Sequence, residues 1–205
     1  MDNLIRKPSS PMRWLQALTV MVALSSAANA AAQTYRQDVK VPPIEVFQSM
    51  LTFAEAGEFQ KVVGSLPVLS PILEHIDQKF KFGAADHIRS VSSGGDRASV
   101  VAAVEELIIW DMKDLLDESL TNLDRSIDAA RTPIRTARFN YELLAPLVRR
   151  KAPPADDLIK RAFGEALRTM AAPGAPETVE ATRKTIARQL TLIVFELAKV
   201  FPQRM

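Results

Sequence analysis

Cysteine is absent from all 205 residues of the chain, and histidine occurs only twice. Without cysteine there is no disulfide framework, no thiolate metal site, no Cys-x-x-Cys-His haem attachment, no cysteine nucleophile and no lipidated cysteine. Glycine is also scarce, with seven residues, while 47% of the residues are hydrophobic. This composition is typical of a globular chain and excludes a disordered one.

The first thirty residues have the pattern of a secretory signal peptide. Three basic residues precede a short apolar run over 14–24, namely Arg6, Lys7 and Arg13. The small residues Ala28-Asn29-Ala30 follow as a cleavage site of the Ala-x-Ala type, and Ala30-Ala31-Ala32 is a second such site. The run of about 11 apolar residues is shorter than the ~20 that span a bilayer, which disfavours the alternative of an uncleaved anchor. We therefore expect cleavage after Ala30 and a periplasmic protein.

An excess of either charge is missing from the remainder of the chain. Residues 1–30 hold three of the 26 basic residues and one of the 24 acidic residues, which leaves 23 of each in residues 31–205. A neutral chain has no basic surplus to neutralise phosphates, so nucleic acid is excluded as an expected partner. We also expect no membrane span after the signal peptide is removed, because no later apolar run is long enough.

Residues 31–41 are polar and without a period, and we expect a flexible arm there. From residue 42 to residue 205, apolar residues recur every three or four positions, and no run alternates as a strand does. The pattern predicts an all-α domain, a helical bundle of six to eight helices. Its strongest element is a helix over about 97–119, which Asp96 is expected to cap.

Glycine and proline predict where the other helices end. Gly57 is expected to end the first helix and Gly83 a later one. Thr132-Pro133 is expected to separate a helix over 121–131 from one over 134–150, since proline interrupts helices. Loops are predicted over 152–154 and 171–176. Pro67, Pro71 and Pro146 are expected to bend the chain and so to shape a groove.

A weak internal repeat relates two segments that lie 85 residues apart. Residues 107–116 align without gaps on residues 192–201, with aliphatic, aromatic and acidic positions in register. The alignment indicates either a duplicated unit, which would give two pseudo-repeated halves, or two amphipathic helices that share a pattern. Both interpretations remain open from the sequence.

Three acidic residues fall on or beside the apolar faces of their predicted helices. At ~100° per residue, Asp111 and Glu105 lie within the apolar face of the 97–119 helix, and Glu196 lies at the edge of the last helix. A buried carboxylate requires a partner. The acids are therefore expected either to pair with an arginine such as Arg138 or Arg188, which is favoured, or to bind a metal ion together.

The two histidines do not form a known metal motif. The residues three positions before His75 and His87 are Ile72 and Ala84, so the Glu-x-x-His pairs of di-iron bundles are absent. His75 is expected on a solvated polar face. A hairpin between their helices would bring His75 and His87 together as a zinc or copper site, which is the less favoured alternative.

Catalytic motifs are missing too. Neither a phosphate-binding Gly-x-x-x-x-Gly-Lys-Ser/Thr loop nor a Gly-x-Ser-x-Gly elbow occurs. The acidic group of Asp111, Asp114, Asp117 and Glu118 is interpreted mostly as a solvated helix face. We therefore expect a non-catalytic binding protein of the periplasm, with no cofactor, whose partner is another periplasmic or envelope protein or a small ligand. The alternative is a metal- or haem-handling bundle that uses Asp111, Glu196, Glu105, His75 and His87.

Overall fold

The structure, a computed structural model, describes residues 41–171 and 176–202. These residues form eight α-helices and one 3-10 helix, without a strand, which confirms the all-α fold class. The helices are α2 (Pro43–Ala56), α3 (Phe59–Ser65), η1 (Leu66–Leu69), α4 (Ser70–Phe80), α5 (Ala84–Gly94), α6 (Arg97–Leu123), α7 (Ile127–Lys151), α8 (Pro153–Ala171) and α9 (Pro176–Val200). The predicted signal peptide (1–30) and all but the last residue of the predicted arm (31–41) lie outside the described residues.

Helix α2 begins and ends where the sequence predicts. Pro43 occupies its first position, where a missing N–H costs nothing. Gly57 adopts a left-handed φ of 76°, and its N–H donates to the Ala54 carbonyl while the Glu58 N–H donates to the Phe53 carbonyl. This pair of bonds satisfies carbonyls that the helix leaves open at its C-terminal end.

Gly83 does not end a helix, contrary to the prediction. Helix α4 ends at Phe80, and Lys81 takes the left-handed conformation with a φ of 56°. Gly83 instead caps the N-terminus of α5. The Asp77 side chain fixes this turn, since it accepts a hydrogen bond of 2.9 Å from the Ala84 N–H.

Asp96 caps α6 as predicted and accepts a hydrogen bond from the Ser99 N–H. The predicted break at Thr132-Pro133 is wrong, because α7 is one helix from Ile127 to Lys151 with Pro133 and Pro146 inside it. Ser126 sets its start by accepting bonds from the N–H groups of residues 128 and 129. Pro133 gives up one helical hydrogen bond, and its ring is buried against the core instead.

The predicted loop over 152–154 shrinks to one residue. Only Ala152 separates α7 from α8, and the two prolines that follow are the first residues of α8. Proline is tolerated in a first helical turn, so a proline pair marks a helix start here rather than a loop. Residues 172–175 of the second predicted loop lie outside the described residues.

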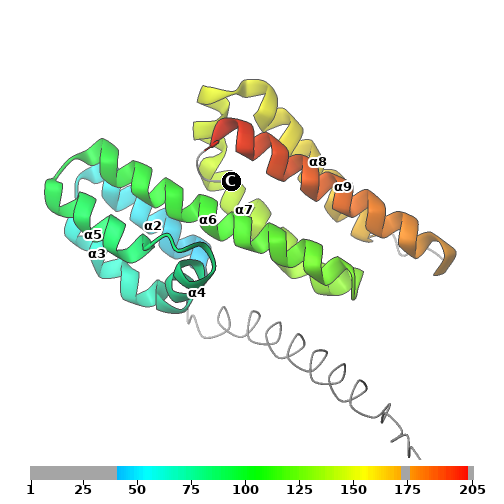
Figure 1. The fold of residues 1–205 in the computed structure, drawn as a ribbon. Coiled ribbons are helices and arrows are strands. Elements are labelled where there is room, and N and C mark those ends of the chain that lie inside the picture. The colour runs from blue at the N-terminus through cyan, green and yellow to red at the C-terminus, as the bar shows by residue number, and fades with distance from the viewer. Residues whose placement is uncertain (1–40, 172–175, 203–205) are drawn as a thin grey trace, which may run out of the picture.

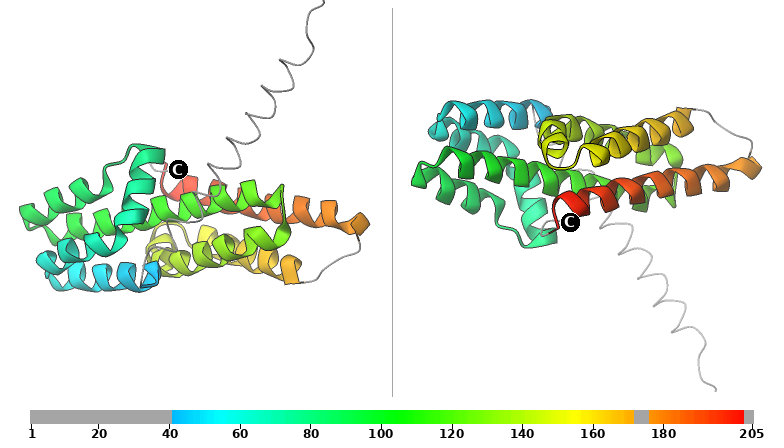
Figure 2. Two further views of the ribbon diagram at one scale, coloured as in Figure 1. Left: turned by 90° about the horizontal axis from the view of Figure 1, so that it is seen from below. Right: turned by 90° about the horizontal axis from the view of Figure 1, so that it is seen from above.

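Helix α6 forms the axis of the molecule (Figure 1). Helices α2 to α5 gather around its N-terminal half, α7 runs along it, and α8 and α9 form a pair that extends towards its other end, as the two further views in Figure 2 also show. The most extensive packing joins α6 with α7 and α8 with α9. At the end of the described chain, the Lys151 ammonium lies 5.1 Å from the centre of the Phe201 ring.

One continuous core runs through all eight α-helices. Its largest fully buried side chains include Phe47, Ile108, Tyr141 and Phe163. The two halves of the chain are not built from matching helices. The turns at 57, 81–83 and 95–96 fall, 85 residues later, on 142, 166–168 and 180–181, all within α7, α8 or α9. The 85-residue alignment therefore does not extend to the order of the helices.

Candidate functional site

Asp111 lies in the core, as its helical phase predicts. Its side chain is fully buried, and its Oδ2 accepts a hydrogen bond of 2.6 Å from the Asn140 amide on α7. An amide therefore takes part where the sequence suggested an arginine. Arg138, one of the two arginines considered, lies 4.0 Å from Glu142 on its own helix.

Glu196 is also buried, with 5% of its surface exposed, but its partner is local. The Lys199 ammonium, one turn later on α9, lies 2.7 Å from its carboxylate. Asp111 and Glu196 were predicted to meet near the axis of the bundle. The structure gives each acid a partner of its own: an amide from α7 for Asp111 and a lysine of the same helix for Glu196.

The two histidines contact different acids on α6. His75 Nε2 lies 3.1 Å from an oxygen of Asp114, and His87 Nε2 lies 3.8 Å from an oxygen of Glu106. These acids are eight residues apart, which is about 12 Å along a helix. Helices α4 and α5 thus direct their histidines to separate positions. Within residues 41–171 and 176–202, no group of three or more histidines and acids is placed to hold a metal ion.

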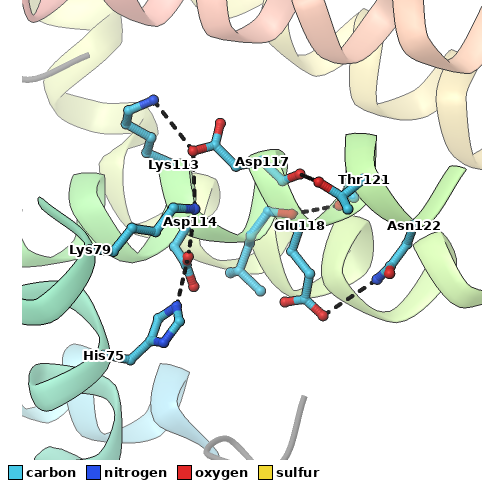
Figure 3. A network of polar contacts seen from close by, with 10 residues as sticks. His75, Lys79, Lys113, Asp114, Asp117, Glu118, Thr121 and Asn122 are labelled. Atoms are coloured by element: carbon cyan, nitrogen blue, oxygen red, sulfur yellow. Dashed lines mark hydrogen bonds and ion pairs between the residues drawn. The ribbon is translucent and has the colours of Figure 1, made fainter. Parts of the chain in front are cut away.

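His75 and Asp114 belong to a polar network that joins α4 to α6 (Figure 3). The Lys79 ammonium lies 2.9 Å from Asp114 and 3.1 Å from Asp117, and Lys113 lies 3.5 Å from Asp117. Burial lowers the pKa of Lys79, but attraction to Asp114 and Asp117 outweighs it, so the pKa lies above its ordinary value. The prediction of a solvated face is wrong for Asp114, which α4 covers and which is 2% exposed.

Asp156 is a second buried acid that the sequence analysis did not single out. The Tyr141 hydroxyl donates to one of its oxygens at 2.7 Å, while Arg149 and Lys160 each donate to the other at 2.9 Å. Burial raises the pKa of Asp156, but the bonds from Tyr141, Lys160 and Arg149 lower it further, so the net pKa is below its ordinary value. Its first-turn position in α8 was the only sequence signal, because the donors belong mainly to the end of α7.

An open groove of about 670 Å³ lies where α2, α6 and α7 meet. Small and apolar side chains form much of its wall, namely Leu51, Ala98, Val101, Ala102, Leu143, Pro146 and Leu147. Charged residues complete it, namely Glu55, Asp96, Arg97, Glu105 and Arg150. Of the three prolines expected to shape a groove, Pro146 lines this one. Glu105, predicted within the apolar face of α6, is half-buried at this groove, because α2 and α7 leave that part of α6 uncovered.

The charged residues of the groove differ in whether they are already engaged. Asp96 is bonded to Ser99 as the cap of α6, and Glu105 has an interaction of its own. Glu55, Arg97 and Arg150 are exposed and form no ion pair with another described residue. Two arginines and one glutamate are thus left available to a ligand.

The apolar wall continues along α7 beyond the groove. Phe139, four residues before Leu143, has 56% of its surface exposed, which is exceptional for a phenylalanine in this protein. At ~100° per residue, Phe139, Leu143, Pro146 and Arg150 fall within about 60° of one another on the helix. A strip of three turns therefore runs from an exposed aromatic ring to a free arginine. Such a surface can bury apolar groups of a ligand and orient a charged one.

Comparison with known proteins adds no relative: no family model matches the chain, and neither a curated protein nor a solved structure matches it significantly. Among the helices described, none combines the length and apolarity that crossing a membrane requires.

Proposed function

We propose that this protein is exported to the periplasm and acts there as a non-catalytic interaction protein. In this proposal it holds a segment of another envelope protein in the groove between α2, α6 and α7. The observation that supports it most is the apolar wall of the groove, which continues into the exposed Phe139. The first thirty residues supply the argument for export.

The geometry of the groove favours a segment of a protein over a small molecule. Pockets for small ligands enclose most of the ligand surface, whereas this groove is open and passes into an exposed strip on α7. Apolar groups that leave water contribute roughly 25 cal/mol per Å². A long contact with Leu143, Leu147 and Phe139 therefore gains more than one confined to the groove.

The alternative of a metal- or haem-handling bundle has no supporting observation among the described residues. Asp111, Glu196 and His75 each contact a protein group, and no cluster of potential ligands is found there. We therefore carry forward only the interaction function.

Photo-crosslinking in living cells tests the proposal. A photo-crosslinking amino acid in place of Leu147, inside the groove, is expected to give a covalent adduct with one envelope protein. The same amino acid in place of Arg188, which is exposed on α9, is the matched control and is expected to give none. Equal adducts from both positions, or none from position 147, would contradict the proposal.

A further inference from the structure

The groove also indicates what kind of segment it binds. Resting on the function proposed above, we infer that the partner segment is an amphipathic helix of about three turns, which lies antiparallel to α7 and carries acidic side chains in its first turn. The inference rests on the length of the apolar strip, on the unpaired charges of the groove and on the direction of the two helices that border it.

The length follows from the strip on α7. Phe139 and Arg150 are 11 residues apart, which corresponds to about 16 Å along a helix at 1.5 Å per residue. Leu143 and Pro146 lie between them on the same side. A helix of three turns matches this length, and apolar side chains at intervals of three and four residues would contact the whole strip.

The charge follows from the groove residues that lack partners. Arg97 at the start of α6 and Arg150 at the end of α7 line the same groove, and neither pairs with another described residue. Only Glu55, on α2, opposes them. An acidic group on the α6–α7 side of the bound segment would meet two arginines, while a second acid on the α2 side would meet a like charge.

The direction follows from where those arginines lie. Arg150 is next to the last residue of α7, so the acidic end of the segment lies at the C-terminal end of that helix. Acidic residues stabilise the first turn of a helix, because its open N–H groups carry partial positive charge. A segment whose acids are in its first turn therefore runs opposite to α7, with its later apolar residues over Phe139.

Synthetic peptides provide the probes. Three dye-labelled helical peptides of 15 residues share one leucine face and differ only in two positions: glutamate in the first turn, glutamine in the first turn, or glutamate in the last turn. Binding to the exported full chain is measured by fluorescence anisotropy. We expect the first-turn glutamate peptide to bind about five- to tenfold more tightly than the other two, with the difference lost in 0.5 M salt.

Charge reversal supplies the matched variants. The double variant Arg97→Glu and Arg150→Glu is expected to remove the preference for glutamate and to favour a peptide with lysine in its first turn. Arg188→Glu, an exposed arginine on α9 outside the groove, is expected to leave all affinities unchanged. Circular dichroism of each variant checks that the helices are intact.

Equal affinity for the three peptides, or no binding of any of them, would overturn the inference. The two levels of the proposal remain distinguishable. If position 147 crosslinks a partner while the peptides show no preference, the proposed function stands and the acidic helix is wrong. If neither experiment gives its expected result, both fail.

Discussion

Three fully or almost fully buried carboxylates sit at junctions between helices. Asp111 links α6 to α7, Asp114 links α6 to α4, and Asp156 links α7 to α8. A buried charge is costly without partners, so each acid specifies which donors must approach it. At the scale of single residues, these acids are where one substitution changes stability most.

Removing the charge of Asp156 is expected to destabilise the protein in a pH-dependent manner. At pH 6, Asp156→Asn weakens the bonds from Tyr141, Arg149 and Lys160 and is expected to cost about 1–3 kcal/mol in the free energy of unfolding. Asp156 has a folded pKa below its ordinary value. Its contribution is therefore complete above the unfolded pKa of about 3.9 and is lost as the pH falls through the folded pKa.

Urea unfolding at pH 6 and at pH 3 measures this effect. The difference between the wild type and Asp156→Asn is expected to shrink at the lower pH. Asp157→Asn, which changes the exposed neighbouring acid, is the control and is expected to alter stability little at either pH. A difference for Asp156→Asn that stays constant from pH 6 to pH 3 would contradict the prediction.

At the scale of helices, α4 is the element most dependent on polar contacts. It has 11 residues, and its packing on α6 is slight beside that of α7 on the same helix. Asp114 on α6 accepts from both His75 and Lys79, so one carboxylate attaches α4 at two points. Local opening of such an element requires less free energy than global unfolding.

Asp114→Asn is therefore expected to release α4 without unfolding the rest. Amide exchange across 70–80 should become about five- to tenfold faster, since a lost charge-assisted contact is worth about 1–1.5 kcal/mol. Exchange in α8 and α9 should stay unchanged. Asp117→Asn, whose carboxylate is about one-third exposed, is the matched control and should have a smaller effect. Uniform acceleration throughout the protein would show that Asp114 supports the whole core instead.

Helix α7 contains two prolines in different surroundings. Pro146 is exposed at the groove, whereas Pro133 is buried. Proline inside a helix is less favourable than alanine by up to about 3 kcal/mol. Pro146→Ala is therefore expected to raise the unfolding free energy by about 1–3 kcal/mol, as measured by urea unfolding. Pro133→Ala should gain less, because it also loses buried packing. Equal gains from both variants would contradict this reasoning.

At the scale of the whole molecule, the groove arises because three helices end near one another. Helix α2 ends at Ala56, α6 begins at Arg97 and α7 ends at Lys151, and residues near all three positions line the groove. Each helix end brings a charge with it: Glu55, Arg97 and Arg150. The same arrangement thus supplies an apolar wall and charged residues in one place.

Export is the prediction that concerns the entire chain. Expression of the full chain in a Gram-negative host is expected to place the protein in the periplasmic fraction with an N-terminus at Ala31, as determined by intact mass and N-terminal sequencing. Replacing Ala28 and Ala30 by arginine is expected to prevent cleavage after residue 30. A cytoplasmic protein that keeps residues 1–30 would contradict the prediction and the periplasmic part of the proposed function.

The amino-acid sequence by itself determined the fold class, several helix ends and the burial of Asp111. These features depend on local rules, which a single segment satisfies: apolar residues repeat with the helical period, Gly57 adopts a left-handed turn, and Asp96 bonds to the N–H of Ser99. The same rules misjudged Pro133 and the proline pair at 153–154, because a proline allows a helix start and tolerates a buried helix interior as well as a break.

Only the tertiary structure decided which groups meet. His75 and Asp114 are 39 residues apart, and Asn140 and Asp111 are 29 apart, so no local pattern announces their contacts. The groove has the same origin, since Leu51, Val101 and Leu147 come from three helices. Helical phase determines which side of each helix is apolar, but the packing of neighbouring helices decides which part of that side they cover and which part remains open to a partner.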